Sequence, residues 1–134
     1  MIVVDTNVIG YLYLTGDHST QAERAVLKDP LWAAPLLWRS ELRNVLALYI
    51  RKKLLSLADA QQVMEEALHL MRGREYETMS HHILALAAAS HCSAYDCEFV
   101  ALAQDLNVPL VTVGRQILSQ FPDVAVSLTE FTRG

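Results

Sequence analysis

The sequence predicts an α/β protein, a single-domain three-layer α/β/α sandwich over residues 1–134 with a mostly parallel sheet of about five strands. Short β-branched runs alternate with helical segments along the whole chain, and this alternation is the pattern of βα units. A chain of 134 residues can form one core but is too short for two. Its 52% hydrophobic and 19% charged residues exclude a disordered protein.

Strands and helices are expected to alternate from the first residue. A buried strand, Met1–Val4, leads into a helix. A second helix is predicted to begin at Thr20, where Glu23 completes a capping box. Leu31–Ala34 is the next expected strand, and it stops before Pro35.

Two long helices and a short strand are predicted next. The first helix starts at Trp38 and has one buried stripe, because its apolar residues recur at three- and four-residue steps. These residues are Trp38, Leu42, Val45, Leu46, Tyr49 and Ile50. Ser56 and Asp59 open the second helix, and Gly73 ends it. Glu75–Met79 is predicted as a short strand.

The last third of the chain repeats the alternation. Ser80 is expected to cap a very apolar helix that ends near His91. Ser93 opens the following helix, and Asn107 closes it. The two remaining strands are expected at Val108–Val113 and Val124–Leu128.

Three of the fifteen acidic residues are placed unlike the others. Asp5 follows the first buried strand, at the carboxyl end where ligands bind in open α/β sheets. Glu41 falls in the predicted first turn of a helix, beside the apolar stripe. Asp96 falls in the predicted first turn of another helix. The remaining acids lie on polar faces or in loops, where solvation explains them.

Each of these three acids also has a purely structural interpretation. Asp5, together with Thr6 and Asn7, is suited to capping the first helix. Glu41 could offset the dipole of its own helix, and Asp96 could complete a capping box. Taken singly, the structural interpretation is favoured for Glu41 and Asp96, and the two interpretations are evenly balanced for Asp5.

Together, the three acids predict a metal site. If their strand and helix ends meet at one edge of the sheet, the like charges destabilise the fold unless a cation neutralises them. Ligands that are all oxygen suit Mg²⁺ or Mn²⁺. Such an ion can bridge a phosphate, lower the pKa of a bound water and stabilise a leaving oxygen. It would also allow a chain of net charge −4 to bind nucleic acid.

Four segments of the chain form a series in a characteristic order. They are Val3–Val8, Trp38–Val45, Ser93–Asp96 with Val100–Ala103, and Pro109–Thr112. No single segment is specific, but the four in this order span nearly the whole chain. In that combination they resemble the PIN-domain family, and most closely its VapC-type ribonuclease toxins.

The resemblance implies an endoribonuclease that depends on Mg²⁺ or Mn²⁺ and cleaves RNA phosphodiesters. It also implies a homodimeric toxin whose cognate antitoxin protein fills the active site with its tail. On this resemblance, Asp5, Glu41 and Asp96 correspond to the catalytic, metal-binding acids. Thr6 and Asn7 match the polar positions after the first acid, which would orient it.

One position departs from the family pattern. In the family, the strand ending Leu-Val-Thr is followed after one residue by a fourth acid and then a basic residue, whereas here Gly114 takes the acidic position before Arg115. Metal affinity is therefore expected to fall, although three carboxylates can still hold one Mg²⁺. Thr112 could supply a nearby hydroxyl. Asp123 is a second candidate substitute, whereas Glu98 is expected to point to another helix face.

Three arginines are candidates for contacts to the RNA backbone near this cleft. They are Arg39, Arg43 and Arg115. Contacts from arginine to phosphate position an RNA strand without reading its bases. A solvated surface role fits each of the three equally well.

Two other functions are open alternatives. A degenerate PIN-like module would bind RNA or an antitoxin with weak or no cleavage, because Gly114 replaces the fourth acid. A phospho-receiver-like module also carries an acid at a strand end. The chain lacks the additional acids and the late lysine that such a module needs, since its lysines are Lys28, Lys52 and Lys53.

Nothing in the sequence points to export or to a membrane. No apolar stretch approaches the roughly 20 residues of a membrane-spanning helix. Asp5 and Asn7 interrupt the apolar start, where a signal peptide would need a continuous apolar run. Cys92 and Cys97 fit reduced, partly buried thiols. We therefore expect a cytoplasmic protein.

Overall fold

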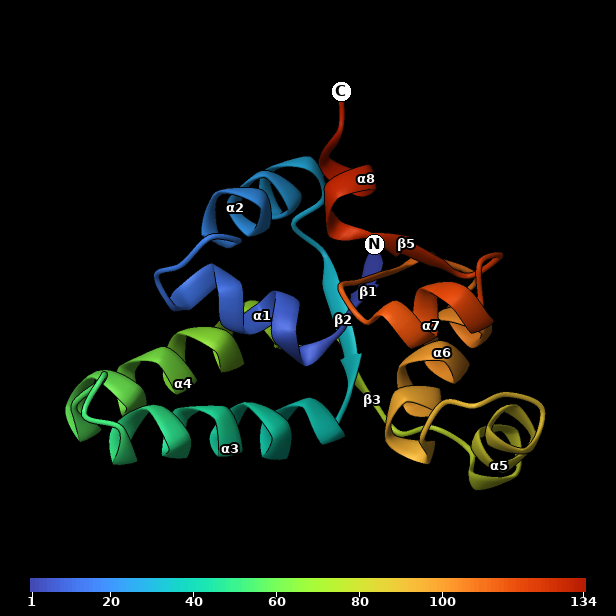
Figure 1. The fold of residues 1–134 in the computed structure, drawn as a ribbon, viewed down its shortest axis with the longest axis horizontal. Helices are drawn as coiled ribbons and strands as arrows, with labels where there is room; N and C mark the ends of the chain where they lie inside the picture. Colours follow the sequence, from blue (N-terminus) through green and yellow to red (C-terminus); the bar gives the residue numbers. More distant parts are fainter.

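The computed structural model describes all 134 residues and shows a five-stranded parallel sheet covered by helices (Figure 1). The strands are β1 (Ile2–Val4), β2 (Trp32–Pro35), β3 (Glu75–Tyr76), β4 (Leu110–Thr112) and β5 (Ala125–Ser127). The helices are α1 (Thr6–Tyr13), α2 (Ser19–Lys28), α3 (Leu37–Arg51), α4 (Leu57–Met71), α5 (Ser80–Ala88), α6 (Ala94–Leu106), α7 (Arg115–Gln120) and α8 (Leu128–Thr132). None of the helices combines the length and apolar character that crossing a membrane requires.

The strand order is β3-β2-β1-β4-β5, and every neighbouring pair is parallel. The central strand β1 therefore lies between β2, which pairs Ala33 with Val3, and β4, which pairs Leu110 with Val3. The chain moves outward from β1 in one direction through β2 and β3, and then crosses back to β4 and β5. This reversal between β1 and β4 creates the crevice where open α/β sheets bind ligands. The order also differs from the 2-1-3-4-5 order of receiver-like folds.

Helices cover both faces of the sheet, so the predicted three-layer sandwich is confirmed. In Figure 1, α1 to α4 lie on one side of the strands, and α5, α6 and α7 lie on the other. The three residues of β1 are at most 2% exposed, as expected for a parallel strand with helices on both faces. Trp32 and Trp38 are also fully buried and belong to the same continuous core.

Two of the predicted helix starts are wrong. Helix α2 begins at Ser19 and has no side-chain cap, so Thr20 and Glu23 do not form a capping box. Helix α5 begins at Ser80 itself, after Met79, and also has no side-chain cap. In both places a serine or threonine beside a helical pattern predicts a cap, but the backbone becomes helical at or before that residue.

Other predicted helix ends are confirmed. Ser56 and Ser93 each accept a hydrogen bond from a backbone N–H three residues later, at 3.0 and 3.1 Å. Asn107 ends α6 in the left-handed conformation, with φ of 55°, which asparagine tolerates better than most residues.

The edges of the fold differ most from the prediction. Strand β3 has only two residues, because only Glu75 and Tyr76 pair with the edge of β2. Strand β4 is shorter than the predicted strand Val108–Val113, and α5 ends at Ala88 rather than near His91. Helices α7 and α8 were not predicted. Helix α3 starts one residue before Trp38, so Glu41 is the fifth residue of the helix rather than part of its first turn.

Candidate active site

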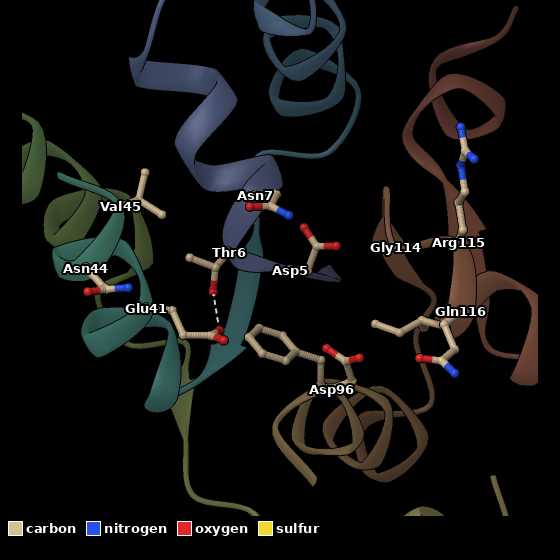
Figure 2. A pocket seen from close by; sticks show the side chains of 12 residues that line it. Asp5, Thr6, Asn7, Glu41, Asn44, Val45, Asp96, Gly114, Arg115 and Gln116 are labelled. Atoms are coloured by element: carbon tan, nitrogen blue, oxygen red, sulfur yellow. Dashed lines mark hydrogen bonds between the residues drawn. The ribbon is translucent and has the colours of Figure 1, made fainter. Parts of the chain in front are cut away.

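A cavity of about 400 Å³ opens at the crevice between β1 and β4. Its walls come from the ends of both strands and from α1, α3, α6 and α7. The lining residues are Asp5, Thr6, Asn7, Glu41, Asn44, Val45, Asp96, Phe99, Gly114, Arg115, Gln116 and Ile117. Figure 2 shows the carboxylates of Asp5, Glu41 and Asp96 turned toward the same space. The structure thus brings together the three acids that the sequence singled out.

Asp5 is fixed by donors on both of its carboxylate oxygens. Its Oδ1 accepts from the backbone N–H of Val8 at 3.0 Å, so Asp5 is also the N-cap of α1. Its Oδ2 accepts from the hydroxyl of Thr112 and from the backbone N–H of Val113 at 3.2 Å. Burial raises the pKa of Asp5, these hydrogen bonds partly lower it, and the charge of Asp96 raises it further. The capping and the cleft-facing interpretations are therefore both correct for this residue.

Glu41 enters the cavity from α3 and contacts α1. The hydroxyl of Thr6 donates to its Oε1 at 2.7 Å (Figure 2). Burial raises the pKa of Glu41 most, the Thr6 hydrogen bond lowers it, and the charges of Asp96 and Asp5 raise it again. Because Glu41 lies beyond the first turn, the N-terminal dipole explanation for this acid does not hold.

Asp96 faces the cavity from the first turn of α6. Its backbone N–H donates to the N-cap Ser93, while its half-buried side chain turns toward Asp5 (Figure 2). Burial raises the pKa of Asp96, and a hydrogen bond with Ser93 lowers it. All three acids of the cavity are therefore harder to ionise than free carboxyls.

This donor set fits a hard divalent cation. The three carboxylates offer only oxygen. Burial raises the pKa of each, and neighbouring acids raise the pKa of Asp5 and Glu41 further, a penalty that a bound cation would relieve. No three acidic, histidine or cysteine side chains are close enough to hold one ion by themselves. Mg²⁺ usually keeps several waters in its coordination shell, so it does not require direct contact with all three acids.

Gly114 lies at the mouth of the cavity as the residue before α7. Its φ is −71°, which any residue can adopt, and its backbone N–H donates to the hydroxyl of Thr112 at 3.0 Å. An added Cβ would lie 3.3 Å from that hydroxyl and 3.4 Å from Ile117 Cδ1. The backbone therefore does not require glycine here, and a side chain would fit tightly.

No other acid replaces the missing one. Asp123 lines a different cavity, beside Asn107 and Pro109 at the amino end of β4. Glu98 accepts from Thr78 at 3.5 Å and does not line the cavity, although its charge contributes to the raised pKa of Glu41.

The structure separates the three candidate arginines. Arg39 does not line the cavity, because its guanidinium makes two hydrogen bonds to Glu75, at 2.5 and 2.7 Å. Arg43 is exposed and also lies outside the lining. Arg115 lines the cavity, and Figure 2 shows its side chain extending away from the carboxylates.

Two polar residues of the cavity were missed by the sequence analysis. Asn44 follows Glu41 by three residues on α3, and this spacing, which places two side chains on one helix face, was the available signal. Gln116 belongs to α7, a helix too short to show an apolar period.

Comparison with known proteins identifies the family. Residues 2–124 match the family model of the PIN domain. The chain belongs to the PIN-domain family. The matched range includes every residue that lines the cavity, so the candidate site lies within the PIN domain.

A curated relative supports the predicted subgroup. Ribonuclease VapC3 of Pyrobaculum aerophilum is 32% identical to this PIN-domain chain over 124 residues, which cover 90% of this chain and 95% of the relative. The resemblance to the PIN-domain family and its VapC-type ribonucleases is confirmed.

Solved structures share the PIN fold across almost the whole chain. A Pyrobaculum aerophilum protein gives a TM-score of 0.78 at 18% identity and covers 98% of this chain and 92% of its own. A toxin–antitoxin complex from Klebsiella pneumoniae gives 0.72 at 19% identity, covering 96% and 98%. FitAcB from Neisseria gonorrhoeae gives 0.70 at 21%, covering 95% and 96%. At these identities the likeness establishes the fold.

Proposed function

We propose that this PIN-domain protein is an endoribonuclease that hydrolyses RNA phosphodiesters with a bound Mg²⁺ or Mn²⁺, and that it is the toxin of a toxin–antitoxin pair. The observation that carries the proposal is that Asp5, Glu41 and Asp96, from three separate elements, face one cavity at the carboxyl end of the sheet. The name of the 32% identical relative, a ribonuclease, agrees with it.

In this proposal Asp5, Glu41 and Asp96 would hold the metal, directly or through waters of its coordination shell. When bound, Mg²⁺ or Mn²⁺ supplies Lewis acidity, which lowers the pKa of water and offsets charge on the phosphate. Asp5 is the fixed member, because its two oxygens are already oriented by backbone and hydroxyl donors. Thr6 orients Glu41 in the same way.

The remaining roles concern RNA and protein partners. Arg115 is the arginine best placed to contact phosphate, since it lines the cavity, and Arg43 is exposed on α3 two residues after Glu41. Asn7, which is exposed at the edge of the same cavity, is positioned to contact the strand as it enters. The proposal includes a cognate antitoxin, a homodimer and a cytoplasmic location.

An RNA cleavage assay tests the proposal. The wild-type chain should cleave single-stranded RNA with Mg²⁺ or Mn²⁺ and lose this activity in a chelator. Asp5→Asn and Asp96→Asn should each lower the rate at least about 100-fold, a scale typical of lost catalytic groups. Glu23→Gln, an exposed acid on α2 outside the cavity, is the matched control and should behave as wild type. Equal activity in all four proteins would remove the proposal.

Gly114 favours a second candidate function, a degenerate module that binds RNA or an antitoxin with weak or no cleavage. Gly114→Asp should then raise both metal affinity and cleavage rate, since it adds the missing carboxylate. Gly114→Ala measures the cost of the Cβ contact with Thr112 by itself. Robust turnover by the wild-type chain would exclude this candidate.

A further inference from the structure

A second cavity, of about 160 Å³, adjoins the cavity of the three acids. The two cavities share Thr6, Asn7 and Val45 as lining residues. The second one extends between α1, α3 and the loop that joins α1 to α2. None of the functions assigned above uses it, and we refer to it as the side cavity.

Helix periodicity explains why the two cavities lie next to each other. On α3, Glu41, Val45 and Tyr49 follow one another at four-residue steps and so share one face. Glu41 lines the first cavity, Val45 lines both, and Tyr49 lines the side cavity. At about 1.5 Å per residue, Tyr49 lies about 12 Å along the helix from Glu41. On α1, Asn7 and Tyr11 are related by the same step.

The side cavity is walled by aromatic rings. Tyr11 and His18 stack with their ring centroids 4.6 Å apart and their planes at 29°, and Tyr49 contributes a third ring from α3. The loop that carries His18 is closed by Ser19, whose hydroxyl donates to the carbonyl of Leu14 and accepts from the N–H of Gly16. The aromatic wall is therefore already formed without a ligand.

The chemistry of the lining fits a base better than a phosphate. No lysine or arginine lines the side cavity, and Asp17 at its rim disfavours an anion. Asp17, Asn7 and Thr15 instead offer hydrogen-bonding groups beside the rings. Flat aromatic faces with a few polar groups at the edge are how proteins bind unstacked bases of single-stranded RNA.

We propose that the side cavity binds one nucleobase of single-stranded RNA, belonging to a nucleotide near the phosphate held at Asp5, Glu41 and Asp96. The inference rests on the proposed ribonuclease function. It makes Tyr49, Tyr11 and His18 determinants of where an RNA strand is positioned, and they do not take part in bond cleavage.

Binding experiments separate this inference from the cleavage reaction. In an Asp96→Asn background with Mg²⁺, fluorescence anisotropy would measure the affinity for a short single-stranded RNA and for versions in which each base in turn is removed. One abasic position should weaken binding about tenfold, which corresponds to loss of one stacking contact. Adding Tyr49→Leu should abolish that penalty, whereas Tyr49→Phe should keep it.

Tyr95→Leu is the control, because Tyr95 is 63% exposed and lines neither cavity. Thermal unfolding would show that Tyr49→Leu remains folded. If every abasic RNA binds as well as the intact strand, or if the penalty persists in Tyr49→Leu, the side cavity does not bind a base. A Tyr49→Leu variant that keeps full RNA affinity and loses affinity for a protein partner would also overturn the inference. If the wild-type chain does not cleave RNA but the abasic penalty is still present, the result counts against the proposed function alone.

Discussion

Asp5 is held by more contacts than the other acids of the cavity. Three donors from α1 and from the end of β4 fix its two oxygens, and one of them is the fully buried hydroxyl of Thr112. This hydrogen bond is the largest of the effects that lower the pKa of Asp5 against the effect of burial. Thr112 therefore positions and stabilises the charged form of Asp5.

Replacing Thr112 tests that role. Thr112→Val keeps the shape and removes the donor, so the free energy of unfolding near neutral pH should fall by about 1–3 kcal/mol. The pKa of Asp5 should rise, and the acid limb of the pH–activity profile should move to higher pH. Thr112→Ser, which keeps the hydroxyl, should leave the limb in place. An acid limb that is identical in wild type and Thr112→Val would contradict this role.

The raised pKa values of Asp5, Glu41 and Asp96 also predict how stability varies with pH. A carboxyl whose pKa is raised by folding binds more protons in the folded than in the unfolded chain, so its stabilising contribution is present below its ordinary pKa and is lost as pH rises through the raised value. Mg²⁺ binds the ionised form and stabilises the folded chain. The rise in Tm on adding Mg²⁺ should therefore grow as the pH rises above the ordinary carboxyl pKa of about 4.

Thermal unfolding with Mg²⁺ and with a chelator measures this difference directly. Groups with a lowered pKa, such as Glu75 and Asp29, make a contribution to stability that has the opposite pH dependence. This contribution is the same with Mg²⁺ and with chelator, so it cancels in the difference in Tm. Asp96→Asn should reduce the Mg²⁺ effect, and Glu23→Gln should not. A Tm increase that is independent of pH would show that these acids are not the binding groups.

At the scale of elements, one ion pair joins α3 to β3 at the edge of the sheet. Arg39 and Trp38 both donate to Glu75, and Arg39 is the main cause of the lowered pKa of Glu75. That contribution to stability is present above the ordinary pKa of Glu75 and is lost as pH falls through the lowered value. The pair therefore stabilises the attachment of the two-residue strand β3.

Arg39→Gln should lower the free energy of unfolding by about 1 kcal/mol, because the pair is partly exposed. It should leave the salt dependence of RNA binding unchanged, since Arg39 does not reach the cavity. Arg115→Gln is the matched comparison, and it should weaken RNA binding and reduce the salt slope by about one. Urea unfolding and binding titrations at several salt concentrations distinguish the two variants. A reduced salt dependence of RNA binding in Arg39→Gln would show that Arg39 does contact phosphate.

The sequence predicted the elements that are long or buried. The apolar runs of β1 and β4 and the periodic stripe of α3 follow from single-chain patterns, because burial imposes them directly. Helix α7 has six residues and α8 has five, which is too short for a period to show. The extent of β3 depends on its partner β2, and this information is not local to residues 75–79.

The candidate site was predictable to a similar degree. Asp5 could be recognised because an acid directly after a buried strand is unusual. Glu41 and Asp96 gained significance only in combination, since neither position is distinctive alone. Arg39 pairs with Glu75 instead of facing the cavity, and Gln116 lines the cavity. Both facts depend on tertiary contacts that the sequence spacing does not encode.

At the scale of the whole molecule, the reversal of strand order between β1 and β4 assembles the cavity. It brings Asp5 next to Thr112, which lies 107 positions away in the sequence, and places the starts of α6 and α7 beside them. None of the residues of helix α5 is buried, although α5 packs against α6. Met79 and Leu84 are 68% and 63% exposed there.

We expect this apolar face of α5 to pack against a second copy in the proposed homodimer. Leu84→Glu should then shift the chain toward monomer, because a charge would be buried at the interface, without changing the fold of the monomer. Light scattering coupled to size exclusion measures the mass, and Ala88→Glu, on the same helix, extends the test. A dimer that is unaffected by both changes would place the interface elsewhere.

The hydrogen bonds on both carboxylate oxygens of Asp5 affect which loss-of-function mutations should be selected. If the chain is toxic to the cell that makes it, survivors arise by mutation. A change at Asp5 removes the cap of α1 and a hydrogen bond between the ends of β1 and β4. It should therefore lower the level of folded protein as well as its toxic activity. Glu41 has a single hydrogen-bond partner, Thr6. Survivors that still accumulate full-length protein should therefore carry lesions at Glu41 more often than at Asp5.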